Sequence, residues 1–298
     1  MKTRIAVALS LGLAASGPAA AALHVASDRT VGGFVHIESV SYDPHAKALY
    51  VSEFGTEKLA ADLKDGNGRI VKVGLDGKVI DKQFLPAKGG APMNKPKGGW
   101  VRGNHFWVTD IDGVWEFDLK TRKGRKLAIP DAVFANDPAI LENALYVSDN
   151  RGDKLFRIEP ADFLGSKKAP VITTVLAGKG IAPNGLWPAR DGMLLMGGFN
   201  LKTPNPIYGL GVSGQIKNLT PPLGNIDGLY ELADGSYLGT DWKTGSLFRW
   251  TEAGGMQELA KGFKGPADFC VVPGAKGAMT VFVPDLVQGQ LRIIQLRP

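Results

Sequence analysis

The tetrapeptide Pro183-Asn184-Gly185-Leu186 places a polar amide on a turn of proline and glycine, directly before an apolar run. The strand that follows it, Leu194-Leu195-Met196-Gly197-Gly198, belongs to a pattern that occurs six times. The other copies are Leu49-Tyr50-Val51-Ser52-Glu53, Phe106-Trp107-Val108-Thr109-Asp110, Leu145-Tyr146-Val147-Ser148-Asp149, Tyr237-Leu238-Gly239-Thr240-Asp241 and Val281-Phe282-Val283-Pro284-Asp285. Counting back 13 to 17 residues from the end of each copy reaches one polar or charged side chain, and these are Glu38, Lys97, Asn136, Asn184, Asp227 and Asp268. The sequence therefore predicts six repeats that share a ring of polar groups.

The spacing of the repeats predicts the fold. The copies end at residues 53, 110, 149, 198, 241 and 285, so the five intervals span 232 residues, or about 46 each. Periods of about 40 to 50 residues with four short strands are typical of β-propeller blades. The 39 glycines and 19 prolines provide many turns, and no long helical periodicity appears. We expect an all-β protein, a six-bladed β-propeller of four-stranded antiparallel blades, in a single domain over residues 23–298.

The fourth repeat shows the expected blade most clearly, with strands over residues 185–188, 193–198, 206–212 and 215–219. The sixth repeat ends at Ile293-Ile294-Gln295-Leu296 with only three visible strands. We expect the stretch His24-Val25-Ala26 to complete that blade, because closure of the ring removes exposed sheet edges.

The first 22 residues have the pattern of a secretory signal peptide. Lys2 and Arg4 precede an apolar stretch over residues 5–15, and small residues follow through Ala22. No later segment approaches the roughly 20 apolar residues that a membrane-spanning helix needs. We therefore expect a periplasmic or secreted protein without a membrane span, acting on a small molecule as a monomer.

The charge pattern argues against nucleic-acid binding. Without Lys2 and Arg4 the formal net charge falls from +6 to +4. The densest basic run, residues 120–126, lies at a predicted hairpin tip and has no interleaved aromatic residues. Cys270 is the single cysteine, which excludes a disulfide framework, and its apolar neighbours predict a small buried hydrophobic residue.

Common catalytic motifs are absent from the sequence. Residues 209–214 match GxGxxG, but the following residues continue as a strand rather than a helix, which argues against a dinucleotide site. The chain contains no GxSxG, HExxH or Walker A motif. Any chemistry is therefore expected from the polar ring itself.

The six ring residues share one position, the entry to the first strand of each blade. Entries to first strands lie on one face of a propeller, so the ring should surround the mouth of the central channel. The longest connections, residues 55–68, 86–96 and 200–205, share that face. We expect them to form a lid or a specificity wall.

Among the ring members, the hard oxygen donors expected to bind a metal are Glu38, Asn136, Asn184 and Asp227. Such hard donors suit Ca²⁺ first, with Mg²⁺, Mn²⁺ or Zn²⁺ as alternatives, and two carboxylates balance one dication. Asp227 is the expected proton shuttle. The alternative is that each residue only caps a turn, although Asp227 and Asp268 would repel in a narrow channel unless a cation or Lys97 offset them.

The order of these motifs resembles the regucalcin-like gluconolactonase family over nearly the whole predicted mature chain. The residues that carry the resemblance are Glu38-Ser39-Val40-Ser41-Tyr42, Asn136-Asp137, Pro183-Asn184-Gly185-Leu186 and Ile226-Asp227-Gly228-Leu229. The resemblance implies a six-bladed propeller that opens lactones, with a divalent metal held by Glu38, Asn136, Asn184 and Asp227. It also implies that Asp227 is the catalytic acid and base.

The chain departs from that family beside the expected site. Ser39, Val40 and Tyr42 replace the family's Gly, Pro and Trp, and Phe134 stands where the family has a substrate-binding Arg. An apolar ring in place of a bidentate donor favours a less polar substrate than a sugar lactone.

Two further residues have open roles. His36 lies two residues before Glu38, and we weigh a supporting or structural role for it against catalysis. Lys97 is expected across the channel from Asp227, where it would tune that carboxyl or stabilise an anion, unless its ammonium reaches solvent instead.

The sequence thus favours an exported, metal-dependent hydrolase of lactones or related esters. The alternatives are a metal-dependent phosphotriesterase on the same fold, and a non-catalytic propeller that binds a ligand or a protein.

Overall fold

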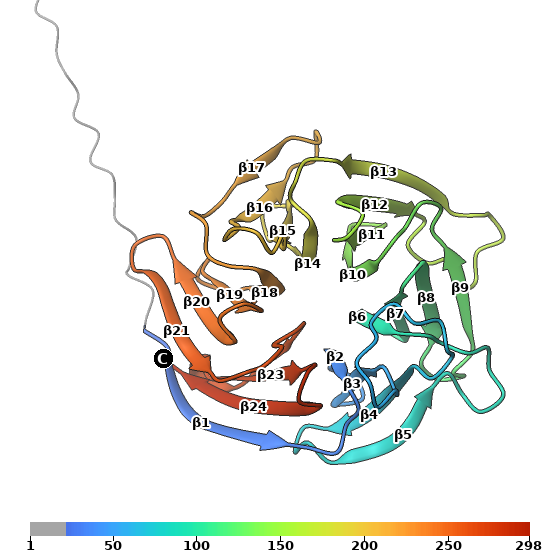
Figure 1. Ribbon diagram of the computed structural model, residues 1–298, viewed down its shortest axis with the longest axis horizontal. Coiled ribbons are helices and arrows are strands. Elements are labelled where there is room, and N and C mark those ends of the chain that lie inside the picture. Colours follow the sequence, from blue (N-terminus) through green and yellow to red (C-terminus); the bar gives the residue numbers. More distant parts are fainter. Residues whose placement is uncertain (1–21) are drawn as a thin grey trace, which may run out of the picture.

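The computed structural model describes residues 22–298, so the predicted signal peptide lies outside the described residues apart from Ala22. Within these residues the chain forms six four-stranded sheets around a central axis (Figure 1). Strands that pair within a sheet are antiparallel throughout. The predicted six-bladed β-propeller is therefore confirmed. No helix in this part of the chain is long and apolar enough to cross a membrane.

The blades follow one another along the sequence. Blade one contains β2 (Ile37–Asp43), β3 (Ala48–Glu53), β4 (Arg69–Gly74) and β5 (Val79–Leu85). Blade two contains β6 (Pro96–Arg102), β7 (His105–Asp110), β8 (Gly113–Asp118) and β9 (Gly124–Ala128). Blade three contains β10 (Ala135–Leu141), β11 (Ala144–Asp149), β12 (Lys154–Glu159) and β13 (Val171–Ala177).

The second half of the chain repeats the same order. Blade four contains β14 (Pro183–Pro188), β15 (Leu194–Gly198), β16 (Ile207–Leu210) and β17 (Ile216–Asn218). Blade five contains β18 (Ile226–Glu231), β19 (Tyr237–Asp241), β20 (Ser246–Thr251) and β21 (Gly255–Lys261). Blade six contains β22 (Cys270–Pro273), β23 (Met279–Asp285) and β24 (Gln290–Arg297), with the short 3-10 turn η1 (Ala275–Gly277) before β23.

The N-terminal strand closes the ring. β1 (His24–Val31) pairs with β24 from His24↔Arg297 to Val31↔Leu291, so blade six has the order β1-β24-β23-β22. The outer edge of β24, which would otherwise be exposed, is thereby paired. The prediction that the N-terminal segment completes the last blade is confirmed, and the strand extends five residues beyond the predicted stretch.

An acidic residue ends the second strand in five of the six blades. Its carboxylate accepts backbone N–H groups from the segment that leads into the first strand of the same blade. Asp149 accepts from Val133 (2.6 Å) and Phe134 (3.0 Å), and Asp110 accepts from Asn94 (3.1 Å) and Lys95 (2.9 Å). Glu53, Asp241 and Asp285 do the same in their blades. These contacts hold the chain just before the ring level in each of the five blades.

The hydrophobic core lies in layers between neighbouring blades. One layer joins Trp107 and Val114 of blade two to Leu145 and Phe156 of blade three. Because each blade buries its face only against its neighbours, the starts of the six first strands are held in fixed positions around the axis.

Two local predictions need adjustment. β16 and β17 are shorter than predicted, since a turn begins at Gly211 and the pairing ends at Asn218. The basic run at 120–126 forms a turn and the start of β9, and Lys126 is paired with Asp112 (2.6 Å).

Candidate active site

The register of the sheets shows which residues share a level around the axis. In each blade the last residue of the second strand pairs with one residue of the segment that enters the channel. These pairs are Ile37↔Glu53, Pro96↔Asp110, Ala135↔Asp149, Pro183↔Gly198, Ile226↔Asp241 and Pro266↔Asp285. The next residue in each blade occupies the ring level, and the set is Glu38, Lys97, Asn136, Asn184, Asp227 and Ala267. Five of the six predicted ring residues are therefore at equivalent positions.

These five residues line one cavity of about 920 Å³ at the channel mouth. All five residues are buried, with between 0% and 5% of their surface exposed. Phe134 lines the same cavity, which also has apolar walls from Phe54, Phe199, Trp242 and Leu286. The structure thus combines a polar floor with a largely apolar wall.

Asp268 does not belong to this ring, and the prediction of its level is wrong. It lies one residue beyond Ala267, pairs with Ser39, and lines a second, smaller cavity. Its backbone N–H donates to the Glu38 carbonyl (3.1 Å). Its charge still contributes to the raised pKa of Glu38, although less than burial and Asp227 do.

His36 also lies outside the large cavity. Its Nδ1 is 2.9 Å from the Leu286 carbonyl and its Nε2 is 3.0 Å from the Glu57 carbonyl. His36 therefore ties blade six to the connection after β3, which agrees with the structural alternative considered for it.

Burial raises the pKa of both ring carboxyls. Burial, followed by the charge of Asp227, raises the pKa of Glu38 well above its usual range, whereas Lys97 opposes the shift. Burial raises the pKa of Asp227 to about 7, and the nearby Asn184 amide opposes this shift. Asp227 therefore changes its charge near neutral pH.

Lys97 is fully buried, so the alternative that its ammonium reaches solvent is wrong. Its Nζ donates to the Lys95 carbonyl (3.2 Å) and lies 4.1 Å from the centre of the Phe134 ring. Burial lowers the pKa of Lys97 to about 8, and Glu38 is the group that most opposes this shift. Glu38, rather than the predicted Asp227, is thus the main electrostatic partner of Lys97.

The four predicted metal ligands fit a hard cation. Glu38 Oε2 and Asp227 Oδ1 are buried and have no hydrogen-bond partner among the described residues. Burying carboxylate oxygens without a partner is unfavourable, and a dication would relieve that cost. Asn136 and Asn184 line the same cavity and offer neutral oxygen donors, as calcium sites commonly do.

Arg151 is a cavity residue that the sequence analysis missed. Its guanidinium carbon lies 3.8 Å from the centre of the Phe134 ring, and its Nη1 donates to Asp62 (2.9 Å). An arginine is therefore present beside Phe134, but it comes from the turn after β11 instead of from the segment before Asn136. Its position just after Asp149, on the ring face, is the signal that could have identified it.

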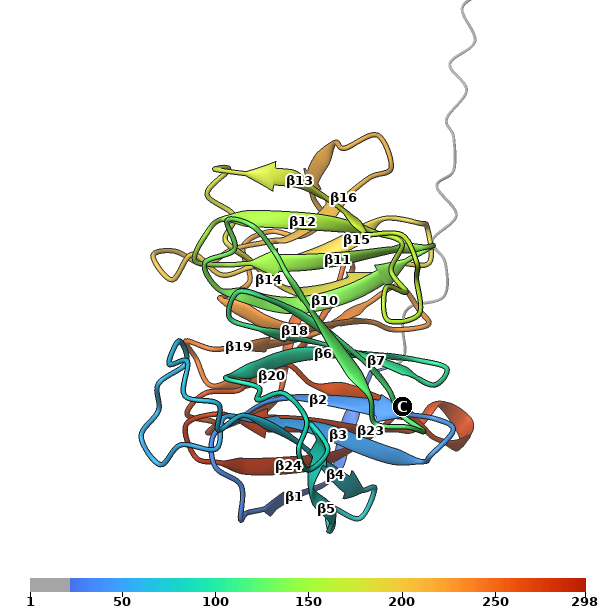
Figure 2. The ribbon, with the colours of Figure 1, turned by 90° about the vertical axis from the view of Figure 1, so that its right-hand side faces the viewer.

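Two of the three long connections form the cavity wall. The connection after β3 contributes Leu59 through Asp62, and the connection after β15 contributes Asn200 through Lys202. In Figure 2 the connection after β3 projects on the left, away from the body of the blades. It is anchored to blade two, because Lys95 Nζ donates to Asp65 (2.6 Å) and to the Phe54 carbonyl (3.2 Å). Residues 86–96 do not line the cavity, so for them the prediction of a wall is wrong.

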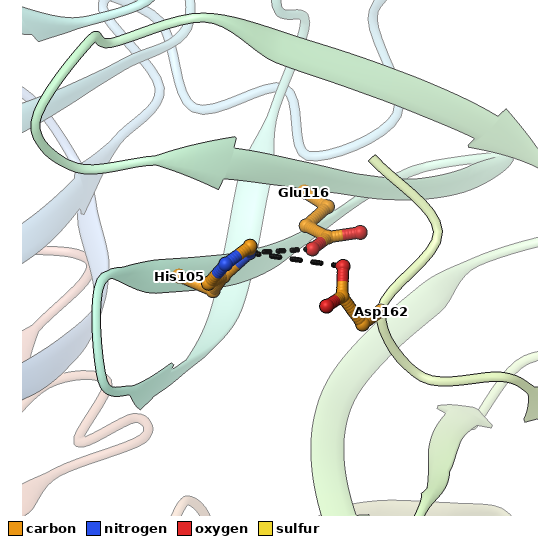
Figure 3. Close-up of side chains that lie close together, drawn as sticks. All are labelled: His105, Glu116 and Asp162. Atoms are coloured by element: carbon orange, nitrogen blue, oxygen red, sulfur yellow. Dashed lines mark hydrogen bonds and ion pairs between the residues drawn. The ribbon is translucent and has the colours of Figure 1, made fainter. Parts of the chain in front are cut away.

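A second cluster of metal-type side chains lies away from the channel. His105, Glu116 and Asp162 bring their ligand atoms together between blades two and three (Figure 3). Glu116 Oε1 is 2.7 Å from His105 Nδ1, and Glu116 Oε2 accepts the N–H groups of Phe163 and Leu164, each at 2.6 Å. Both oxygens are thus in use, and the cluster clamps the connection after β12 to blade two.

No family model matches the chain, and no curated protein matches it. Among solved structures, the fold is similar to virginiamycin B lyase from Staphylococcus aureus, with a TM-score of 0.59, 13% identity, and coverage of 91% of this chain and 99% of that chain. A catalytically inactive His-to-Ala variant of that lyase, with quinupristin, gives a TM-score of 0.56, 15% identity, and coverage of 91% and 100%. A protein provisionally named a gluconolactonase gives a TM-score of 0.65, 16% identity, and coverage of 92% and 94%. At these identities the similarity shows the fold, and in this respect it agrees with the family resemblance found in the sequence.

Proposed function

We propose that this protein is an exported, divalent-metal-dependent hydrolase of lactones or related esters, with its active site in the large cavity. The observation that carries the proposal is the pair of buried, unpartnered oxygens, Glu38 Oε2 and Asp227 Oδ1, beside two asparagines on the cavity floor. The resemblance to the gluconolactonase family points to the same four residues.

Glu38, Asn136, Asn184 and Asp227 would hold the cation, and their oxygen chemistry favours Ca²⁺ over metals that prefer nitrogen or sulfur. When bound, the metal would polarise a substrate carbonyl or acidify a water molecule. No described histidine or cysteine lines this cavity, which makes Zn²⁺ a weaker candidate than Ca²⁺, Mg²⁺ or Mn²⁺.

Asp227 is the group that would move the proton. Burial raises the pKa of this carboxyl in the metal-free protein, so its carboxylate is a stronger base than an exposed one and can return the proton later in the reaction. It would take a proton from the water that attacks the carbonyl carbon, and then give it to the alkoxide that leaves when the ester C–O bond breaks. The products are a carboxylic acid and an alcohol, which remain in one molecule when the substrate is a lactone.

Lys97 would support this chemistry as a buried positive charge. It lies on the polar floor of the cavity, offsets the charge of Glu38, and could stabilise the oxyanion that forms on the substrate. The aromatic and aliphatic walls would accept an apolar substituent on the lactone or ester. Arg151 is already paired with Asp62, so it adds less polarity than an unpaired guanidinium would.

The lyases with the same fold offer a contrast. In the Staphylococcus aureus enzyme, replacing one histidine by alanine gives a catalytically inactive protein. None of the described histidines of the present chain lines the large cavity. Hydrolysis with Asp227 as the base is therefore the better-supported chemistry here than a reaction that depends on a histidine.

Two measurements test the proposal together. We expect Ca²⁺ to raise the melting temperature, because a ligand at 100 times its Kd stabilises the native state by about 2.7 kcal/mol. Glu38→Ala and Asn184→Ala should lose this gain. A panel of lactones, esters and phosphotriesters, assayed with and without chelator, should show chelator-sensitive turnover of an apolar lactone or ester.

The possible results separate the alternatives. Turnover of phosphotriesters alone would favour the phosphotriesterase alternative, and metal-dependent stabilisation without any turnover would favour the binding propeller. No effect of Ca²⁺, Mg²⁺, Mn²⁺ or Zn²⁺ on melting would disprove the metal site. Export is tested separately, since the mature protein should begin near Ala22 or Leu23 and be recovered outside the cytoplasm.

A further inference from the structure

A second cavity, of about 260 Å³, lies deeper along the same inner strands and is lined by different residues from the large one. In five blades, the residue three positions after the ring level pairs with the residue three positions before the end of the second strand. The pairs are Ser41↔Tyr50, Trp100↔Trp107, Trp187↔Leu195, Tyr230↔Leu238 and Cys270↔Phe282. All five inner-strand members of these pairs line the smaller cavity, so it too is built on one level of the propeller.

Aromatic rings form much of its wall. The Trp187 ring centre lies 5.4 Å from that of Trp100 and 4.3 Å from that of Tyr230. Tyr42 and Phe269 complete the aromatic lining. Four of these residues, all except Phe269, are only partly buried, and each also packs against a neighbouring core cluster.

Two carboxyl groups belong to this lining. Asp137 and Asp268 contribute them, from blades three and six, and no basic residue lines the cavity. Ser41 adds a hydroxyl that is 95% buried and has no hydrogen-bond partner among the described residues. A buried polar atom without a partner, facing a cavity, indicates that a ligand or water belongs there.

We propose that this smaller cavity is a second binding site, which takes a small organic ammonium cation between the faces of Trp100, Trp187 and Tyr230 and the carboxyls of Asp137 and Asp268. Aromatic faces attract cations through their quadrupoles, with energies that increase when the site excludes water, and alkylated ammonium groups are the ligands that such cages recognise. The carboxyl oxygens add partial negative charge to the lining, and the cavity volume limits the ligand to a small molecule. This site does not depend on the function proposed for the large cavity.

The binding of choline, compared with that of its uncharged analogue 3,3-dimethylbutan-1-ol, tests the proposal. The two probes have nearly the same shape and differ in charge, so calorimetry should show choline binding at least tenfold more tightly. Equal affinities would mean that shape and not charge is recognised, and absence of choline binding would overturn the proposal outright.

Variants show where the probe binds. Trp187→Leu and Asp268→Asn should each weaken choline binding at least tenfold, whereas Trp242→Leu, in the wall of the large cavity, should leave it within twofold. Asp268→Asn keeps the shape of the side chain, so it provides a second measurement if Trp187→Leu fails to fold. If Trp242→Leu removes binding, or if saturating Ca²⁺ displaces choline, the smaller cavity is not an organic cation site.

Discussion

Asp227 and Glu38 lie in the same buried space, so ionising one carboxyl makes ionising the other more costly. Burial is the larger cause of both shifts, and Lys97 and Asn184 moderate them. The polar floor of the cavity therefore contains two carboxyls with raised pKa values, one buried ammonium, and two amides that cannot titrate.

Asp227→Asn should reduce kcat by about 100-fold or more, because general base catalysis contributes roughly 10² to 10⁴ and the amide cannot accept a proton. The wild-type rate should fall at acidic pH, since Asp227 is the active base only when ionised, and bound Ca²⁺ should move that fall below the pKa of about 7 that burial gives the metal-free carboxyl. A pH–rate profile and a melting curve check both points. Asp191→Asn, on an exposed turn, is the matched control and should behave like the wild type. Full activity of Asp227→Asn would remove this residue from the mechanism.

Lys97→Met should lower turnover at least tenfold, which corresponds to about 1.4 kcal/mol. The substitution keeps the length of the stem and removes the buried charge that opposes the raised pKa of Glu38. Metal affinity should therefore change as well, and calorimetry with Ca²⁺ measures it. Lys202→Met removes a lysine from the exposed rim of the same cavity and should have little effect. Unchanged kinetics and unchanged metal binding in Lys97→Met would show that this charge has no part in the site.

Among the connections between strands, the one after β3 matters most for access to the cavity. Buried Lys95 holds it through Phe54 and Asp65, whereas exposed Lys64 pairs with Asp112. Removing one partner of a buried, hydrogen-bonded ion pair costs more than removing one partner of an exposed pair, which is commonly worth about 0 to 1 kcal/mol.

We therefore expect Lys95→Met to loosen residues 55–68 and to raise KM more than it lowers kcat, because the wall positions the substrate without reaching the reacting atoms. Hydrogen exchange over this connection should increase while exchange in β2 and β6 stays protected. Lys64→Met serves as the comparison and should change neither. If both variants behave alike, the connection is not held by Lys95.

The elements also show how far the sequence could specify the site. The recurrence of one strand predicted six blades, the closure by the N-terminal segment, and five of six ring positions. Blade six differs because the turn that contains η1 lengthens its first hairpin. Counting back from Asp285 to a polar residue therefore gives Asp268, whereas the ring level is occupied by Ala267, one position earlier. Arg151 was missed because its contact with Phe134 joins segments that only the packing of blade three brings together.

The whole propeller places several carboxyls along one axis, with Glu38 and Asp227 at the ring level and Asp137 and Asp268 one residue beyond that level in their blades. Burial is the largest cause of the raised pKa in all four. In the unfolded chain these groups would titrate near 4. Between that pH and the raised values of the native state, the folded protein holds more protons than the unfolded chain.

Stability of the metal-free protein should therefore fall as pH rises from about 5 to about 8, because the native state binds more protons than the unfolded chain over this range. A tenfold difference in proton affinity at a single carboxyl corresponds to about 1.4 kcal/mol, or roughly 2 to 4 °C in Tm for a protein of this size. Saturating Ca²⁺ should reduce or reverse this trend, because the cation favours the ionised carboxylates that burial disfavours. Melting curves of chelated and calcium-loaded protein across this range measure both slopes. Asp227→Asn should flatten the chelated slope and Asp191→Asn should not. A chelated protein that becomes more stable toward pH 8 would show that these carboxyls are already ionised in the native state, and that some partner other than a bound metal stabilises them.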